Sequence, residues 1–545
     1  MLELSPGSVS IRSRMSFLPS MISWLQRVRT SARMAFVWRM VAMGLGSFLG
    51  LLWTRLLLRA MGDPLMGLFQ NFQALTRLGG VGDFGITAAL SLTVGAMLGR
   101  RDEAGLQALL ASARTLFLFL ACGLCVLFLS LSPWLPKWLN FAAVPGAGSM
   151  RWLFVYGGLS LWLTIVGGYF ASLNYAHGTV TWPIFPTVLF AQILAPFFHW
   201  RLALLGMPLW VQMLPYLASG AILTWLAWLM LKWSHPWMGD LTPLKQDRAQ
   251  WKTLAGASWW AYLVSLGTAV YLTTDRLVIG AVIGTAIIPT YQANYKVCDL
   301  GLTLIVTAAF VGFPKITQWI TSPDPEDRRR LLAGLHRLSV FEIVMVCGVV
   351  LGYLAFNNLF IRYWLDSAVA PQAHRAPLFL QFAFAANLAV SVGGNAGIQF
   401  SMRAGGKGLK YGGLVVAGTG LVNLGLSILA VKLVSIYGVN FSIIGVAVAT
   451  VIAQSISSLV LGGVTCRYLG LSVVRWAARC WLLPIGFTFA AAGVKASFPE
   501  SSLAHLSIVS GCYVVLFLVV CWLAGLNREL LRTEFAQVRK MFSLG

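Results

Sequence analysis

The chain has 545 residues and a formal net charge of +23; 58% of its residues are hydrophobic and only 10% are charged. A soluble protein of this length needs far more polar residues to cover its surface, so the composition excludes the soluble globular class. Most basic residues lie in short connections between apolar stretches, where membrane topology and anionic lipid headgroups explain the charge. We therefore expect membrane lipids, and no nucleic acid, as partners.

Residues 1–35 are basic and rich in serine, and they predict a cytoplasmic segment that lies on the membrane surface. About fourteen apolar stretches follow, each close to the ~20 residues that an α-helix needs to cross a bilayer. They lie at 36–58, 65–98, 110–132, 152–174, 180–199, 208–231, 254–282, 286–313, 339–361, 376–400, 411–431, 441–464, 477–494 and 505–524. We therefore predict an all-α, polytopic membrane protein with about 14 transmembrane helices.

The basic residues of the connections are distributed unevenly when these stretches are threaded through a membrane in order. Most of them fall on one side, which holds the two long connections at 233–252 and 321–337 and both chain ends. Positive residues accumulate on the cytoplasmic side of membrane proteins. We therefore predict a multi-pass protein of the bacterial inner membrane with both termini in the cytoplasm.

The two halves of the chain show a weak internal repeat. A shift of 222 residues aligns Gly62, Phe69 and Gln70 with Gly284, Tyr291 and Gln292. Such repeats favour alternating access around a site between two bundles. The predicted organisation is a basic N-terminal segment (1–35), a first six-helix bundle (36–232), a cytoplasmic linker (233–252), a second, pseudo-symmetric six-helix bundle (253–467), two extra C-terminal helices (468–527) and a basic cytoplasmic tail (528–545).

Charged side chains inside the predicted spans are costly, by roughly 2.5–3.5 kcal/mol each on insertion scales, so each of them needs a reason. Nearly all lie in the first, second, seventh and eighth spans. The deep cations predict a cavity that attracts an anionic solute, because arginine in particular matches phosphate oxygens. The substrate-binding candidates are Arg39, Arg55, Arg77, Arg276 and Lys296. The alternative is a set of structural ion pairs, such as Lys296 with Asp299 one helical turn away.

The deep carboxylates Asp83, Asp275 and Asp299 are candidates for ion coupling, because they are able to take up a proton or hold Na⁺. Permanent pairing with a cation is the alternative for each. Glu342 lies closer to the cytoplasmic end of its span, where we expect its side chain to reach the interface. The glycine-rich stretch 79–85 interrupts the second span and predicts either a bend along a substrate path or close helix packing.

Enzyme motifs are missing from the sequence. It contains no H-E-x-x-H, G-x-S-x-G or Walker-type phosphate loop, and its six histidines lie in or beside predicted loops. Cys122 and Cys125 form a C-x-x-C pair, but they lie in the middle of a span with no second pair nearby, which favours ordinary apolar burial over a metal site. We expect no catalytic residue, no metal, no cofactor and no nucleotide hydrolysis by this chain.

Two stretches resemble a known family of transporters. The first opens the apolar region and contains TRLLLRAMGDPLMGLFQ and GDFGITAAL, within 37–90. The second runs from TDRLVIG through QANY to Pro314, within 274–316. Both are similar to the polysaccharide and O-antigen flippases of the multidrug/oligosaccharidyl-lipid/polysaccharide exporter superfamily.

That resemblance implies export of an oligosaccharide linked to polyprenyl diphosphate, for lipopolysaccharide and other surface polysaccharides. Related peptidoglycan-precursor flippases place arginines of the first, second and eighth helices around the diphosphate, and on the comparable helices this chain has Arg39 or Arg55, Arg77 and Lys296. A polysaccharide polymerase and assembly proteins are further expected partners. The alternatives are a peptidoglycan lipid-precursor flippase or a multidrug/cation antiporter of the same superfamily, and, from another class, a membrane polymerase or acyltransferase.

Overall fold

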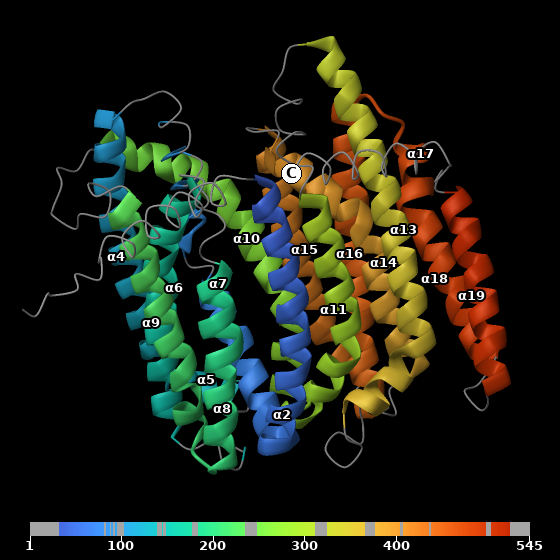
Figure 1. The fold of residues 1–545 in the computed structure, drawn as a ribbon, viewed down its shortest axis with the longest axis horizontal. Helices are drawn as coiled ribbons and strands as arrows, with labels where there is room; N and C mark the ends of the chain where they lie inside the picture. The colour runs from blue at the N-terminus through green and yellow to red at the C-terminus, as the bar shows by residue number, and fades with distance from the viewer. Residues whose placement is uncertain are drawn as a thin grey trace, which may run out of the picture.

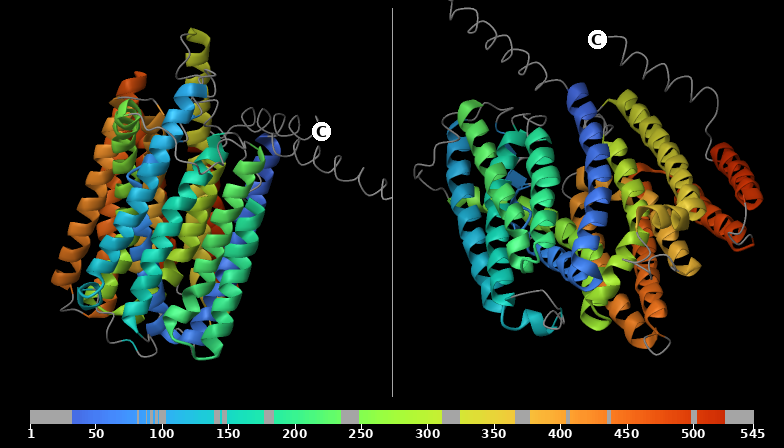
Figure 2. Two further views of the ribbon diagram at one scale, coloured as in Figure 1. Left: turned by 90° about the vertical axis from the view of Figure 1, so that its left-hand side faces the viewer. Right: turned by 60° about the horizontal axis from the view of Figure 1, so that its bottom comes forward.

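The structure, a computed structural model, is an all-α bundle. It describes residues 32–80, 83–87, 89–90, 93–94, 97, 103–138, 144, 149–176, 184–234, 248–310, 324–365, 377–403, 407–434, 438–497 and 503–523. Its long helices run side by side, with the first half of the chain on one side of α2 and most of the second half on the other; the start of α10 extends toward α4 (Figures 1 and 2).

The first half is built around α2, which folds back at Gly62, and around four further long helical segments. Its elements are α2 (Ala32–Gly80), α4 (Glu103–Leu131), the short α5 (Leu135–Trp138), α6 (Met150–Ala176), the segment α7 (Ile184–Pro186), η2 (Thr187–Leu194) and α8 (Ala195–Leu204), and α9 (Leu209–Ser234). The segment η2 is a π-helix that begins directly after Pro186. Proline has no backbone N–H to give to the preceding turn, so a change of helix type at this point is expected.

The second half holds the longest straight helices, followed by a C-terminal group at one edge of the molecule (Figure 1). Its elements are α10 (Arg248–Val282), the turn η3 (Thr285–Ile287), α11 (Ile288–Phe310), α13 (Pro325–Trp364), α14 (Leu378–Arg403), α15 (Lys407–Val434) and α16 (Val439–Leu469). The C-terminal group comprises α17 (Val473–Ala477), the π-helix η6 (Ala478–Leu482), α18 (Leu483–Ser497) and α19 (Leu503–Leu523). α18 and α19 pack against α13, and α18 also packs against α14.

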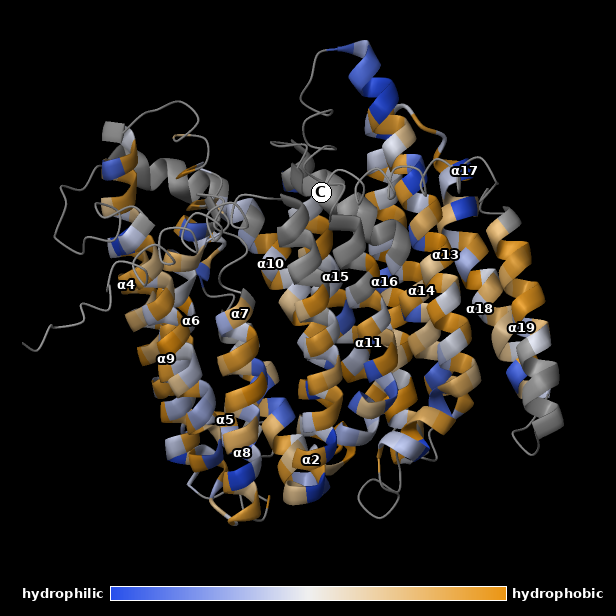
Figure 3. Ribbon diagram, in the orientation of Figure 1, coloured by the Kyte–Doolittle hydropathy of each residue, from blue (hydrophilic) through white to orange (hydrophobic). Residues whose placement is uncertain are grey.

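Eight of the described helices are long and apolar enough to cross a membrane, and two shorter apolar helices lie at Leu378–Ser391 and Gly511–Cys521. Most residues of the long helices are hydrophobic (Figure 3). The multi-pass membrane architecture predicted from the sequence is therefore confirmed. The count of fourteen spans, the domain boundaries and the orientation of the termini stay predictions.

Glycines with positive φ stand at corresponding turns of the two halves. Gly62, where α2 folds back, has φ 73°, and Gly284, between α10 and α11, has φ 123°. These are the two glycines that the 222-residue shift aligns. Gly206 (φ 67°) and Gly438 (φ 105°) stand likewise before α9 and α16. Residues with a Cβ rarely adopt such angles, so glycine is required at these turns.

The two halves meet along α2. One hydrophobic cluster joins Phe72 and Phe154 of the first half to Ile361 and Trp364 of α13. The Trp364 indole Nε1 donates a hydrogen bond of 2.8 Å to the Leu51 carbonyl of α2. The second half therefore contacts the first through both apolar and polar groups, near the turn at Gly62.

Candidate functional site

A polar cluster around Asp275 lies inside the second half, where four helices meet. The Asp275 carboxylate accepts a hydrogen bond from the Tyr291 hydroxyl of α11 to Oδ2 at 2.5 Å. The Thr450 hydroxyl of α16 lies 2.9 Å from Oδ1 and 3.1 Å from Oδ2. The Asn423 amide nitrogen of α15 lies 3.4 Å from Oδ1. Each donor comes from a different helix, so the carboxylate joins α10 to α11, α15 and α16.

A small cavity of about 20 Å³ lies beside this carboxylate. Besides Asp275, its lining includes Arg276, Tyr271 and Asn387, and the Tyr271 hydroxyl donates to Asn387 Oδ1 at 2.9 Å. A cavity needs roughly 10–15 Å³ of such volume to hold one water molecule. The space therefore suits a proton, one water molecule or one small cation among oxygen ligands, and it is far too small for a sugar or a diphosphate.

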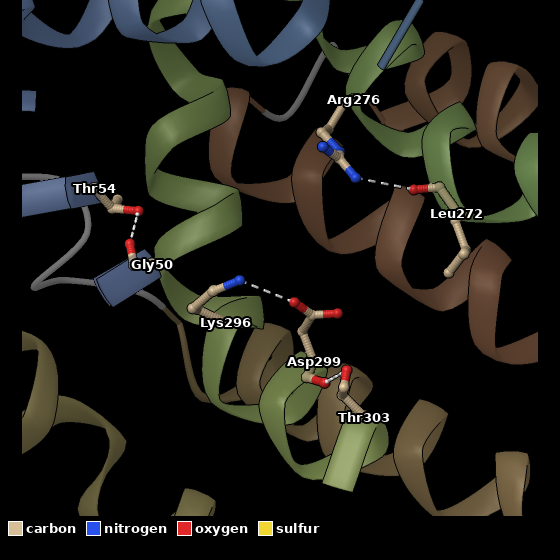
Figure 4. A network of polar contacts seen from close by, with 7 residues as sticks. All are labelled: Gly50, Thr54, Leu272, Arg276, Lys296, Asp299 and Thr303. Atoms are coloured by element: carbon tan, nitrogen blue, oxygen red, sulfur yellow. Dashed lines mark hydrogen bonds and ion pairs between the residues drawn. The ribbon is translucent and has the colours of Figure 1, made fainter. Parts of the chain in front are cut away.

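Lys296 and Asp299 form an ion pair on α11, with 3.0 Å between Lys296 Nζ and Asp299 Oδ2. The Thr303 hydroxyl adds a hydrogen bond to the Asp299 backbone carbonyl one turn further on (Figure 4). The side chains of Lys296 and Asp299 are 30% and 41% exposed, so the pair stays open to a solute. The pairing that the sequence offered as the alternative for these two residues is therefore present.

Three of the predicted cations lie on described parts of helices α2, α10 and α11. Arg55 lies half-buried on α2, and α2 packs against both α10 and α11. On α10, Arg276 Nη2 donates to the Leu272 carbonyl of its own helix at 3.3 Å (Figure 4). Lys296 stands on α11. The structure thus places Arg55, Arg276 and Lys296 on three helices in mutual contact. The side chains of Arg39 and Arg77 lie outside the described residues.

Asp83 has a local structural role. Its Oδ1 accepts a hydrogen bond of 3.0 Å from the backbone N–H of Gly85. Phe84 and Gly85 both have positive φ, 51° and 71°. An added Cβ on Gly85 would lie 2.6 Å from the backbone nitrogen of Tyr262 on α10. Close packing of this turn on α10 is therefore the better interpretation of the glycine-rich stretch, and Asp83 holds the turn together.

One expectation from the sequence is wrong. Glu342 does not reach the membrane interface: its side chain on α13 is buried at 2% exposure, and its Oε2 has no hydrogen-bond partner among the described residues. The error arises because α13 begins at Pro325, well before the predicted span at 339, so Glu342 lies well inside the helix. His199 lies near the end of α8, where its fully buried ring is 3.2 Å from both the Tyr216 hydroxyl and Gln212 Oε1.

The sequence analysis also missed the neutral partners of Asp275. Tyr291, Asn423 and Thr450 carry no charge, and a search for charged side chains does not find them. The available signal was the isolated polar residue in an apolar helix face: Asn423 is completely buried and Thr450 is 6% exposed. Uncharged amides and hydroxyls inside a span indicate interhelical hydrogen bonds. Within the described residues, no group of three or more His, Cys, Asp or Glu side chains could hold a metal ion.

The fold of this multi-pass membrane protein resembles that of solved MOP superfamily transporters. No family model and no curated protein matches the sequence. Solved structures do match in fold, at low identity. The lipid II flippase MurJ in an inward-closed conformation gives a TM-score of 0.61 at 14% identity, covering 88% of this chain and 97% of that chain.

Two other solved structures are similar to the same extent. An inward-facing multidrug resistance MATE family transporter of the MOP superfamily gives a TM-score of 0.60 at 13% identity over 80% of this chain and 98% of that one. The third structure is a MOP superfamily transporter from Pyrococcus furiosus, described as having a binding pocket of reverse polarity. Its TM-score is 0.58 at 13% identity, over 82% of this chain and 98% of that one. These neighbours are transporters, not enzymes, and at this identity they establish the fold of the chain alone.

Proposed function

We propose that this chain flips an oligosaccharide linked to polyprenyl diphosphate across the bacterial inner membrane, for the synthesis of a surface polysaccharide. The two halves rock against each other, so that a site between them opens first to the cytoplasm and then to the outside. The diphosphate binds to cations at the junction, while the lipid chain stays in the hydrocarbon region.

The observation that supports this proposal is that the helices carrying three of the predicted cations, α2, α10 and α11, pack against one another. Arg55 comes from the first half, and Arg276 and Lys296 come from the second. A diphosphate offers several anionic oxygens, and guanidinium groups match them in a bidentate way. A site with cations on both halves also gives the substrate contacts that change when the halves move, which a transport cycle requires.

The acidic groups near the junction support an anionic rather than a cationic substrate. Asp275 is surrounded by three donors, Asp299 is paired with Lys296, and Asp83 is bonded within its own turn. A multidrug/cation antiporter needs a carboxylate whose charge is available to a cationic solute. Each of these three carboxylates is already hydrogen-bonded or paired within the protein, so the antiporter alternative is weakened. A peptidoglycan lipid-precursor flippase has the same anionic requirement and stays the runner-up. A polymerase or acyltransferase is disfavoured by the transporter fold.

The test is leaflet-to-leaflet movement of a labelled polyprenyl-diphosphate oligosaccharide in vesicles that contain the purified chain. We expect Arg55→Ala and Arg276→Ala each to reduce the rate by about tenfold or more, equivalent to roughly 1.4 kcal/mol or more of lost diphosphate binding. Arg329→Ala is the matched control, because the Arg329 side chain is 85% exposed near the start of α13, at the opposite end from the contact between the halves. Equal rates in all three variants would refute the cationic site.

We further propose that Asp275 couples transport to a proton or Na⁺ gradient. The cavity beside it has room for one small ion, and carboxylate, amide and hydroxyl oxygens are ligands that hard cations prefer. An ion or proton at this point changes the charge inside a cluster that spans four helices. The binding state of the cluster therefore biases how those helices pack, which is the physical requirement for coupling.

A further inference from the structure

A second, larger cavity lies in the first half of the chain, away from the cations. Its walls are α6, the end of α7 with η2, and α9, and its volume is about 350 Å³. Two features create this space. Gly167 on α6 and Gly220 on α9 line it without side chains, and Pro186 begins the π-helix that forms its third wall. The volume lies within the range of roughly 300–1,000 Å³ that small-molecule sites occupy.

The chemistry of the lining excludes a charged or sugar-like occupant. None of the described residues that line the cavity carries a charge, and most are leucine, alanine, glycine or methionine. Two of the hydroxyl groups of the lining already have partners within the protein. The Thr164 hydroxyl donates to the Ser160 carbonyl at 2.8 Å, and the Tyr216 hydroxyl lies 3.2 Å from His199 Nδ1. A solute rich in hydroxyl or phosphate groups would find few partners there.

The surroundings of the cavity are those of the bilayer interior. α6, α9 and the η2–α8 segment are all long and apolar enough to span a membrane. Large apolar side chains near the cavity face outward: Leu159 on α6 is 45% exposed and Phe185 on α7 is 66% exposed. A dry void of this size would lose the dispersion contacts of its lining, and apolar walls do not hold water well.

We propose that this cavity binds one long, neutral hydrocarbon chain of a membrane lipid. Two sources have this chemistry: the acyl chain of a phospholipid, and the isoprenyl chain of the lipid-linked substrate. The isoprenyl source rests on the proposed function, whereas the acyl source does not. In either case the chain enters between α6 and the η2 wall, and it fills the volume that the two glycines and the π-helix leave open.

The experiment uses the full chain in lipid nanodiscs with two photoreactive probes. The first is a phosphatidylethanolamine that carries a diazirine in one acyl chain. The second is a polyprenyl phosphate that carries a diazirine in its isoprenyl chain. Cross-linked peptides are mapped by mass spectrometry. We expect at least one probe to label peptides of α6 and α9 at the cavity. Labelling by the acyl probe alone identifies a structural lipid, and labelling by the isoprenyl probe identifies the substrate chain. Failure of both probes to label these peptides overturns the proposal.

Filling the cavity provides the decisive comparison. Gly220→Leu adds a side chain into the space, and its Cβ meets only Leu163 Cδ1, at 3.8 Å, an ordinary contact. Gly123→Leu on α4 is the control, because nothing lies within 4 Å of its Cβ. We expect Gly220→Leu to lose most of the labelling on α6 and α9 and Gly123→Leu to retain it. Ala171→Leu fills the cavity from α6 and serves if Gly220→Leu does not fold. Unchanged labelling in a folded filling variant contradicts the proposal.

Discussion

At the scale of single residues, the chemistry of this chain depends on how each buried charge is surrounded. Asp275 has neutral donors from three other helices, whereas Asp299 has a cation one turn away on its own helix. An ion pair within one helix is indifferent to movements of that helix. A carboxylate held by several helices responds to any change in their relative positions, so Asp275 is the better candidate for coupling.

This difference gives a prediction. Asp275→Asn keeps the shape of the side chain and removes its charge, and we expect it to abolish the acceleration of transport by an imposed pH or Na⁺ gradient. Thr450→Val removes one donor and should weaken the response. The measurement is labelled-substrate translocation in vesicles with and without each gradient, and Asp299→Asn is the control that should keep its response. If Asp275→Asn responds like the wild type, or if the wild type ignores both gradients, coupling at Asp275 is wrong.

Asp63 gives a prediction about pH. It follows the turn at Gly62, between the first two predicted spans, and its Oδ1 is buried without a partner among the described residues. Burial raises the pKa of its carboxyl from the ordinary 3.8 to about 6. Between these values the folded state binds more protons than the unfolded state, so the free energy of unfolding falls as pH rises from about 4 to about 6.

Because Asp63 is only half-buried, solvent screening limits the effect to about 1 kcal/mol. Asp63→Asn removes the titrating group, so we expect this variant to be more stable than the wild type at pH 7 and equal to it near pH 4. Thermal unfolding of the purified protein across this range measures the difference. If the stability of the wild type changes with pH in the same way as that of Asp63→Asn, then Asp63 makes no contribution to the pH dependence of stability.

At the scale of helices, close approach between α10 and α15 is set by glycine. A Cβ on Gly267 of α10 would overlap the backbone of Val416 and Ala417 on α15. Because the obstacle is backbone rather than the end of a flexible side chain, the helices would have to separate. Small residues at such contacts let membrane helices pack closely, and α10 carries Asp275 while α15 carries Asn423.

We therefore expect Gly267→Ala to lower the stability of the protein by about 1–3 kcal/mol, the usual cost of overpacking. It should also weaken gradient coupling, because separation of α10 and α15 moves Asn423 away from Asp275. Gly425→Ala on α15 is the control: nothing lies within 4 Å of its Cβ, and alanine favours a helix over glycine. Thermal unfolding of both variants measures the effect. Equal stability would contradict the close approach.

The sequence predicted the helical class, the membrane character and the positions of most helices, because long apolar stretches are a strong local signal. It also found Gly62 and Gly284 through the weak repeat. It did not predict the two π-helices, because the apolar pattern of a segment as short as eight or five residues does not distinguish a π-helix from an α-helix. Nor could it show that Asp83 serves its own turn, because the bond to Gly85 depends on backbone angles that only the folded chain adopts.

At the scale of the whole molecule, the chain has two helical halves joined along α2 and a cluster of polar residues within the second half. The sequence could list the cations and carboxylates, but it could not tell which of them meet. That information is non-local: Asp275 and Thr450 are 175 positions apart and in hydrogen-bond contact. Likewise, only the folded chain shows that α2, which carries Arg55, packs against α10 and α11 of the second half.

The central claim is that the junction of the halves selects a lipid-linked oligosaccharide. The most direct measurement compares three substrates in vesicles containing the wild-type chain: a polyprenyl-diphosphate oligosaccharide, a peptidoglycan lipid precursor and a lipophilic cation. We predict rapid movement of the first, slower movement of the second and none of the third above protein-free vesicles. Transport of the cation, or movement of the peptidoglycan precursor in preference to the oligosaccharide, would contradict the account.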